Sequence, residues 1–306
     1  MKRILLLLLF LTGLGLQAQN SDISAANGED VVKPVVDSLN GWTTKGNFSL
    51  LLNQSNFSNW AAGGESNLAV NVGINYDFNW KKLDYLWDNK IVASYGFIRT
   101  KTSDFDKKTD DRLEFNSILG KKATGEWDYS FFLNFKTQFT KGYLYAKDAD
   151  GAEFRVENSR FFSPAYLAFG PGMLWKKNDN LKVNLAPLTS KFTFVNSDFT
   201  SVPGYLDGSY FGVDANKCML YQLGFYAQGY YKLNLMTNVS AENTLNLFSN
   251  YLEKPQNVDI DYSLAIVLRV NRYLSANISF QEVYDDDAFE GFQTREVFGL
   301  GINFGF

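Results

Sequence analysis

The C-terminal stretch Thr294–Phe306, TREVFGLGINFGF, decides the fold class of this chain. From Phe298 onward an apolar residue occupies every second position, and glycine or asparagine fills the positions between. Because successive side chains of a β-strand point to opposite faces, this pattern predicts a strand with one apolar face that persists to the last residue.

The same alternation recurs along the chain from Gly41. It is clearest in Asn67–Trp80, Trp127–Thr140 and Val258–Val270. These runs are longer than the strand of about 5 to 6 residues usual in soluble proteins, and they match the roughly 10 residues with which a tilted strand crosses a bilayer. Weaker alternation marks the segments near 46–55, 86–100, 113–121, 163–175, 181–194, 218–231, 235–251 and 274–285. With the last strand, about twelve strands are predicted.

The predicted connections alternate in length. The long ones lie near 56–66, 101–112, 141–162, 195–217, 252–257 and 286–293, and the short ones near 81–85, 122–126, 176–180, 232–234 and 271–273. Four of the six tryptophans, at positions 80, 87, 127 and 175, stand beside short turns. Outer-membrane barrels have long external loops, short periplasmic turns and aromatic girdles at the membrane interfaces.

These patterns predict an all-β fold, a transmembrane antiparallel up-and-down β-barrel of about twelve strands over residues 41–306. The last strand resembles the closing strand of outer-membrane barrels, and an even strand number places both the N- and C-termini in the periplasm. A soluble β-sandwich is the alternative, since 45% hydrophobic residues and a mean hydropathy of −0.20 fit both. A sandwich does not readily explain why the aromatic residues collect at one end.

The N-terminus reads MKRILLLLLFLTGLGLQAQ. This predicts a signal peptide over 1–18, followed by a flexible periplasmic leader over 19–40, and therefore a protein of the bacterial outer membrane. Loss of Lys2 and Arg3 takes the net charge from −4 to −6, which argues against nucleic acid as a partner. The single Cys218 cannot form an intrachain disulfide.

The chain contains no histidine, which excludes His-based hydrolysis and imidazole metal sites. We therefore expect a protein that is not an enzyme and has no cofactor. One metal candidate remains, calcium held by acids at the outer rim: Asp259, Asp261, Asp285, Asp286 and Asp287. A solvated, self-repelling loop is the favoured alternative, because these acids have no recognised liganding spacing.

Charged residues also stand on the face of the predicted strands that is turned toward the interior. They are Asp77, Lys136, Glu242, Arg269 and Arg295, together with Asp259 and Asp261. In a barrel of about twelve strands such groups either line a selective pore or pair with one another and close it.

Several short motifs resemble those of a Bacteroidota family of outer-membrane barrels that is classed as a domain of unknown function. They include Asn59-Trp60, Gly63-Gly64-Glu65, Lys108-Thr109-Asp110-Asp111-Arg112, Phe135-Lys136-Thr137-Gln138-Phe139, Ala186-Pro187-Leu188-Thr189 and Tyr284-Asp285-Asp286-Asp287. The resemblance extends from about Lys45 to the C-terminus. It implies a fold and a location, and it brings no substrate, catalytic residue or cofactor.

Three functions are compatible with these patterns. The leading hypothesis is a passive or gated conduit for small polar solutes. Its rival is a structural or partner-docking barrel with a closed lumen, in contact with outer-membrane lipid and other envelope proteins. A hydrolase that acts through carboxylates such as Asp261 and Asp286 is the third, and no pair at a defined separation supports it.

Overall fold

The computed structural model describes residues 41–58, 65–271 and 273–305, apart from the side chains of residues 290, 303 and 304. By its internal contacts the chain divides into Met1–Lys33 and Pro34–Phe306, and the described strands belong to the second unit. The predicted signal peptide (1–18), the leader (19–40) and the terminal Phe306 lie outside the described residues.

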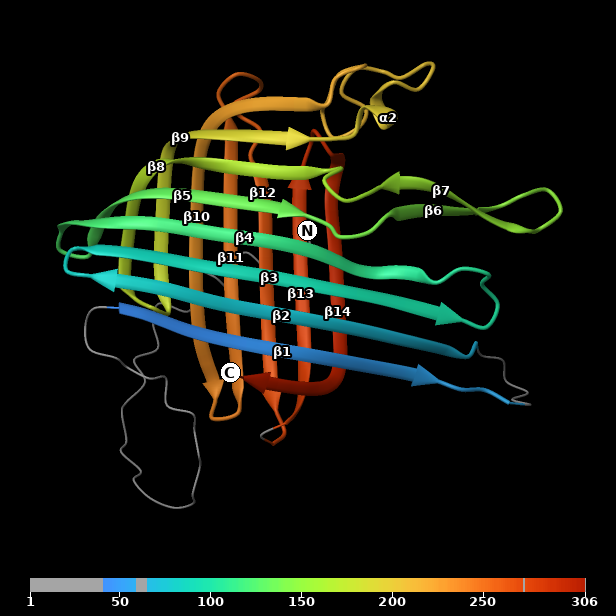
Figure 1. Cartoon of the computed structure of the whole chain (residues 1–306), viewed down its shortest axis with the longest axis horizontal. Helices are drawn as coiled ribbons and strands as arrows, with labels where there is room; N and C mark the ends of the chain where they lie inside the picture. Colours follow the sequence, from blue (N-terminus) through green and yellow to red (C-terminus); the bar gives the residue numbers. More distant parts are fainter. Residues whose placement is uncertain (1–40, 59–64, 272, 306) are drawn as a thin grey trace, which may run out of the picture. The chain divides into compact units, whose positions relative to one another are not determined.

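Twelve antiparallel strands close into one barrel (Figure 1). They are β1 (Gly41–Ser55), β2 (Asn67–Lys82), β3 (Tyr85–Thr100), β4 (Lys107–Thr124), β5 (Trp127–Thr137), β8 (Ala165–Asn178), β9 (Leu181–Phe194), β10 (Met219–Met236), β11 (Val239–Asn250), β12 (Asp259–Arg269), β13 (Leu274–Asp285) and β14 (Phe289–Gly305). Each strand pairs with the next one along the chain, except that β5 pairs with β8 and β14 returns to β1. The predicted fold class and strand number are confirmed.

The two ends of the barrel differ in their connections. At one end, which we call the short-turn end, the strands are joined by residues 83–84, 125–126, 179–180, 237–238 and 270–273. At the other, the long-loop end, the connections include 138–164 and 195–218. The connection between β13 and β14 is shorter than the predicted 286–293, because β14 already begins at Phe289. Phe289 pairs with Asp285 across a register shift.

The connection between β5 and β8 contains a hairpin that the sequence did not predict. β6 (Gly142–Lys147) and β7 (Glu153–Ser159) form a two-stranded sheet of their own beside the barrel (Figure 1). The short helix α2 (Ser197–Thr200) lies in the loop after β9, and the Asn196 side chain caps it. Among the described residues, no helix has the length and apolarity needed to cross a membrane.

The barrel wall is apolar outside and polar inside. Tyr129 and Phe298, on outward positions of β5 and β14, are 62% and 64% exposed, whereas Glu114 and Asn134, on inward positions, are 5% and 8% exposed. This distribution is the reverse of that in a water-soluble domain, where large apolar side chains are buried and charged ones are exposed. An apolar surface of this extent marks contact with another apolar medium.

Candidate functional site: the barrel interior

At the short-turn end, ion pairs cross the lumen. The Glu242 carboxylate on β11 lies 2.5 Å from the Lys232 ammonium and 3.6 Å from that of Lys90 on β3. In the closed strand order, β3 and β11 are separated by five strands in either direction, so they stand on opposite walls. The contact between Lys90 and Glu242 therefore spans the full width of the interior.

A second cluster lies at the same end. The Asp88 carboxylate on β3 is 3.0 Å from the Lys176 ammonium on β8 and 3.5 Å from that of Lys182 on β9. The Lys182 ammonium also lies 5.3 Å from the centre of the Tyr230 ring. In both clusters one lumenal carboxylate is shared by two lysines, and in the second cluster Lys176 also forms an ion pair of 3.1 Å with the exposed Asp179.

The middle of the lumen holds a larger polar network. Lys136 on β5 forms an ion pair with Asp261 on β12, across four intervening strands. Asp261 also accepts a hydrogen bond of 3.0 Å from Gln281. Glu114 forms an ion pair with Arg112 and accepts hydrogen bonds from the amides of Asn116 and Asn134. Buried charges are tolerated when they are paired and hydrogen-bonded in this way.

Aromatic rings fill the lumen beside this network. Phe132 on β5 stacks on Tyr226 on β10, with ring centroids 4.5 Å apart and an angle of 9° between the planes. The Tyr226 hydroxyl donates a hydrogen bond of 2.8 Å to Asn246. Phe132 and Tyr226 are packed with Ala186 and Phe248 into a buried cluster, which is a small apolar core inside a polar interior.

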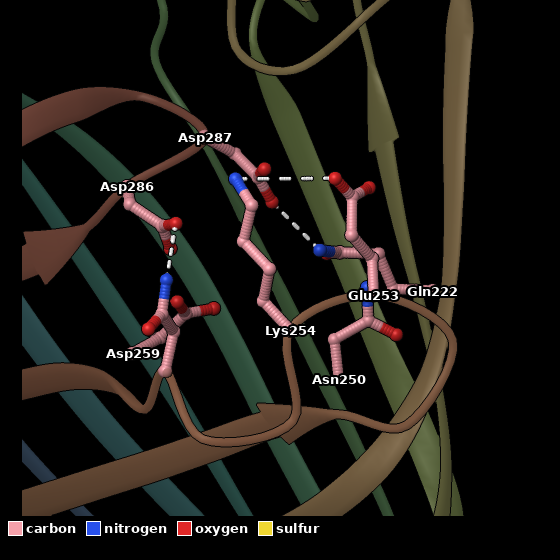
Figure 2. Close-up of a pocket in the computed structure, with 8 residues that line it drawn as sticks. Gln222, Asn250, Glu253, Lys254, Asp259, Asp286 and Asp287 are labelled. Carbon is pink, nitrogen blue, oxygen red and sulfur yellow. Dashed lines mark hydrogen bonds and ion pairs between the residues drawn. The ribbon is translucent and has the colours of Figure 1, made fainter.

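Toward the long-loop end the charge ratio is reversed. The Lys191 ammonium on β9 lies 2.7 Å from Asp259 and 3.3 Å from Asp285, so one lysine is shared by two carboxylates. Asp287 lies beside them and accepts a hydrogen bond of 2.7 Å from Gln222 (Figure 2). Burial raises the pKa of Asp287, and the charges of Asp285 and Asp286 raise it further.

The acids that the sequence grouped as a calcium candidate have protein partners of their own. Asp259 and Asp285 contact Lys191, Asp261 contacts Lys136, and Asp286 accepts a hydrogen bond of 2.8 Å from Asn257. In the part of the chain that the structure describes, no three acidic or cysteine side chains converge in a geometry that would hold a metal ion. We therefore do not include calcium in the proposed function.

The residues predicted to line the lumen have different environments. Lys136 and Glu242 take part in the pairs described above, and Arg295 on β14 forms an ion pair with Asp110 on β4. Asp77 lies opposite Lys45 and Lys90 in the strand register. Arg269 is exposed at the end of β12, beside the turn to β13.

Sequence reasoning missed several charged residues of the interior, namely Asp88, Lys90, Asp110, Arg112, Glu114, Lys176, Lys182, Lys191 and Lys232. The alternation within each strand was the available signal. In β4, for example, Leu113 and Phe115 mark the outward positions, which places Arg112 and Glu114 on the inner face.

Comparisons with known proteins give a partial family match. The model of a family described as a protein of unknown function (DUF3078) matches residues 52–143. Over that range the resemblance to a family of unknown function is confirmed, and the Bacteroidota origin stays a prediction. No protein of curated function matches the sequence.

Among solved structures, the chain is similar to the translocator domain of the autotransporter NalP from Neisseria meningitidis, at 9% identity and a TM-score of 0.34, over 88% of this chain and 90% of that one. It is also similar to an outer-membrane channel from Pseudomonas putida F1, at 9% identity and a TM-score of 0.37, over 92% and 99%. A third is the outer-membrane channel DcaP of Acinetobacter baumannii, at 10% identity and a TM-score of 0.28, over 87% and 96%.

Proposed function

We propose that this protein is an integral barrel of the bacterial outer membrane, with its termini in the periplasm. The outward apolar side chains and the closed hydrogen-bonded sheet support this location, because a spanning structure must satisfy its backbone groups internally and present apolar side chains to lipid. The N-terminal start of β1 and the C-terminal end of β14 both belong to the short-turn end, and short turns are periplasmic in outer-membrane barrels.

We further propose a lumen that is closed at rest, in a non-enzymatic barrel that acts as a docking or structural subunit of the envelope. The contact between Lys90 and Glu242 is the observation that carries this proposal, because it joins opposite walls. The stack of Phe132 on Tyr226 adds a second obstruction. Outside the barrel, the hairpin exposes the apolar side chains of Leu144, Phe154 and Val156, which supports contact with a partner.

Planar-bilayer recordings of the purified, refolded protein test this proposal. The wild-type protein is expected to give no conductance steps at moderate voltage and physiological salt. Regular single-channel steps from wild-type protein would overturn the closed-lumen proposal. Heat-modifiable migration in gels and insertion into liposomes test the membrane location separately.

A gated conduit for small polar solutes is the second candidate, and the nature of the closing contacts favours it. Ion pairs such as Lys136 with Asp261 close the lumen, and a charged solute or high salt competes with such pairs. This candidate predicts that the double variant Glu242→Gln/Asp261→Asn conducts while Asp198→Asn, a change in an outer loop, does not. A double variant that stays silent in folded, inserted protein would contradict the conduit.

A further inference from the structure

A groove of about 450 Å³ lies outside the lumen, between the barrel wall and the hairpin. Its lining includes Tyr95 and Phe97 from β3, Lys108 from β4, and Tyr143, Tyr145 and Arg155 from the hairpin. The hairpin is fixed in place on this side, because the Tyr145 hydroxyl donates a hydrogen bond of 3.2 Å to the Asp106 carbonyl and Lys107 forms an ion pair of 2.8 Å with Glu153.

Aromatic rings hold the Arg155 guanidinium in one orientation. Its central carbon lies 4.1 Å from the centre of the Tyr143 ring and 4.7 Å from that of Phe105. Stacking of this kind engages the flat faces of the guanidinium and leaves its edge of N–H donors available. Such an edge matches two oxygens of a phosphate or carboxylate at once.

The other charged groups around the groove already have partners. Lys108 pairs with Asp111 at 2.9 Å, Lys141 with Glu157 at 2.7 Å, and Asp106 accepts two hydrogen bonds from Arg99. Among the described residues, none forms a hydrogen bond or an ion pair with the Arg155 side chain. Arg155 is therefore the cation of the groove whose charge no neighbouring carboxylate balances.

The groove opens on the outer face of the barrel wall. Tyr95 pairs with Val72 in the register of β3 and β2, and these two outward side chains are 40% and 38% exposed. In the orientation proposed above, this wall faces lipid, and the long-loop end lies at the outer leaflet. An anionic group located at the level of the lipid headgroups would meet Arg155, while the apolar part of the same molecule would contact Tyr95 and Phe97.

We propose that this groove binds the phosphate group of an outer-leaflet lipid, with Arg155 as the anchor. The inference rests on the proposed membrane location. The N–H groups at the edge of the Arg155 guanidinium donate hydrogen bonds to the phosphate oxygens. The rings of Phe105 and Tyr143 keep the guanidinium in place, and the outward aromatic side chains of β3 flank the rest of the lipid.

Native mass spectrometry of the full chain in phosphatidylcholine nanodiscs that contain a small fraction of phosphatidic acid tests this assignment. The wild-type protein is expected to retain phosphatidic acid, and Arg155→Gln to retain it about tenfold less, since one bidentate charge-assisted contact is lost. Arg155→Lys is expected to fall between them, because it keeps the charge and loses the fork. Tyr143→Ala is expected to weaken retention less than Arg155→Gln.

Lys147→Gln is the matched control, because Lys147 is an exposed cation of the same hairpin that does not line the groove. Equal retention by wild type and Arg155→Gln, or an equal loss in Lys147→Gln, would overturn the assignment. So would competition by inorganic phosphate alone at concentrations similar to those of the lipid. A protein that does not insert into the nanodisc, or does not migrate as a heat-modifiable band, would instead count against the membrane location. Insertion and migration are measured for every variant, independently of lipid retention.

Discussion

The ion-pair clusters at the two ends of the lumen have opposite composition. At the short-turn end, Glu242 is shared by Lys90 and Lys232. At the long-loop end, Lys191 is shared by Asp259 and Asp285. Lysines therefore outnumber the carboxylate in the first cluster, and carboxylates outnumber the lysine in the second.

The comparison shows that the charges at both ends of the lumen are paired between strands. In the middle of the lumen, by contrast, Arg112 and Glu114 pair within β4. Each shared group lies between two like charges that would otherwise face each other in a confined space. Its removal leaves an uncompensated pair, whereas removal of one of the two like charges leaves a simple ion pair. The shared residues are therefore expected to be more sensitive to substitution than their partners.

Substitution of Lys191 tests the more buried of the two ends. Lys191→Met leaves the Asp259 and Asp285 carboxylates without their cation, and we expect it to lower the free energy of unfolding by about 3–5 kcal/mol. Urea titration of protein folded in liposomes measures the change. The triple variant Lys191→Met/Asp259→Asn/Asp285→Asn is expected to recover most of the loss, and a loss that persists in it would show that packing of the lysine chain matters more than its charge.

Substitution of Glu242 tests the other end and should have a smaller effect. Glu242→Gln leaves Lys90 and Lys232 unpaired, but these side chains are 31% and 26% exposed, whereas that of Lys191 is 12% exposed. We expect a loss of about 1–3 kcal/mol in the same titration, since partial solvation reduces the cost of an unpaired charge. If Glu242→Gln lowered the free energy of unfolding more than Lys191→Met, the expected order of the two ends would be wrong.

Asp287→Asn tests the excess of negative charge at the long-loop end. Burial and the neighbouring Asp285 raise the pKa of Asp287, so its ionised form is disfavoured in the folded protein. Its contribution to stability is present at acidic pH and is lost as the pH rises through the raised pKa. The variant is expected to be more stable than wild type at pH 8 by about 0.5 kcal/mol and nearly equal to it at pH 4. Thermal melts at both pH values measure this, and a lower stability at pH 8 would contradict it.

Substitution of Glu153 tests an ion pair outside the lumen, where we expect the smallest effect on the stability of the fold. The Lys107 ammonium and the Ser103 hydroxyl lower the pKa of Glu153 to about 2. Because this pKa is lowered from its ordinary value of 4.5, the contribution of Glu153 to hairpin docking is present above that value and is lost as the pH falls toward 2. At neutral pH, the Glu153→Gln variant should show faster amide hydrogen exchange in residues 142–159. The exchange rates of the barrel strands should stay unchanged. Faster exchange throughout the barrel would contradict a local role.

Much of this fold could be predicted from the sequence. Strands such as Asn67–Lys82 alternate without interruption, and a period of two residues also defines which side chains face the lumen. That is why Lys136 and Glu242 were assigned to the interior. The hairpin of β6 and β7 was missed because a segment such as Gly142–Lys147 is short and lies within a long connection.

The contacts across the lumen could not be predicted, because they depend on which strands stand opposite each other and at what height. Lys136 and Asp261 are 125 positions apart in the chain, and only the closed strand order brings them together. The same reasoning applies to the acids of the calcium candidate. They were grouped because the ends of neighbouring strands meet at the same rim. In the structure, Asp259 and Asp285 contact Lys191, whereas Asp261 contacts Lys136.

The seam between the first and last strands has a consequence for biogenesis. In the described residues, β14 meets β1 from Leu300 to Gly305, and a side chain larger than glycine at Gly301 would collide with the carbonyl of Leu50. This pairing joins the first and last strands of the barrel, so it cannot start before β14 has been synthesised. Until β14 is in place, the edge of β1 has unpaired amides, which a hydrocarbon medium does not tolerate.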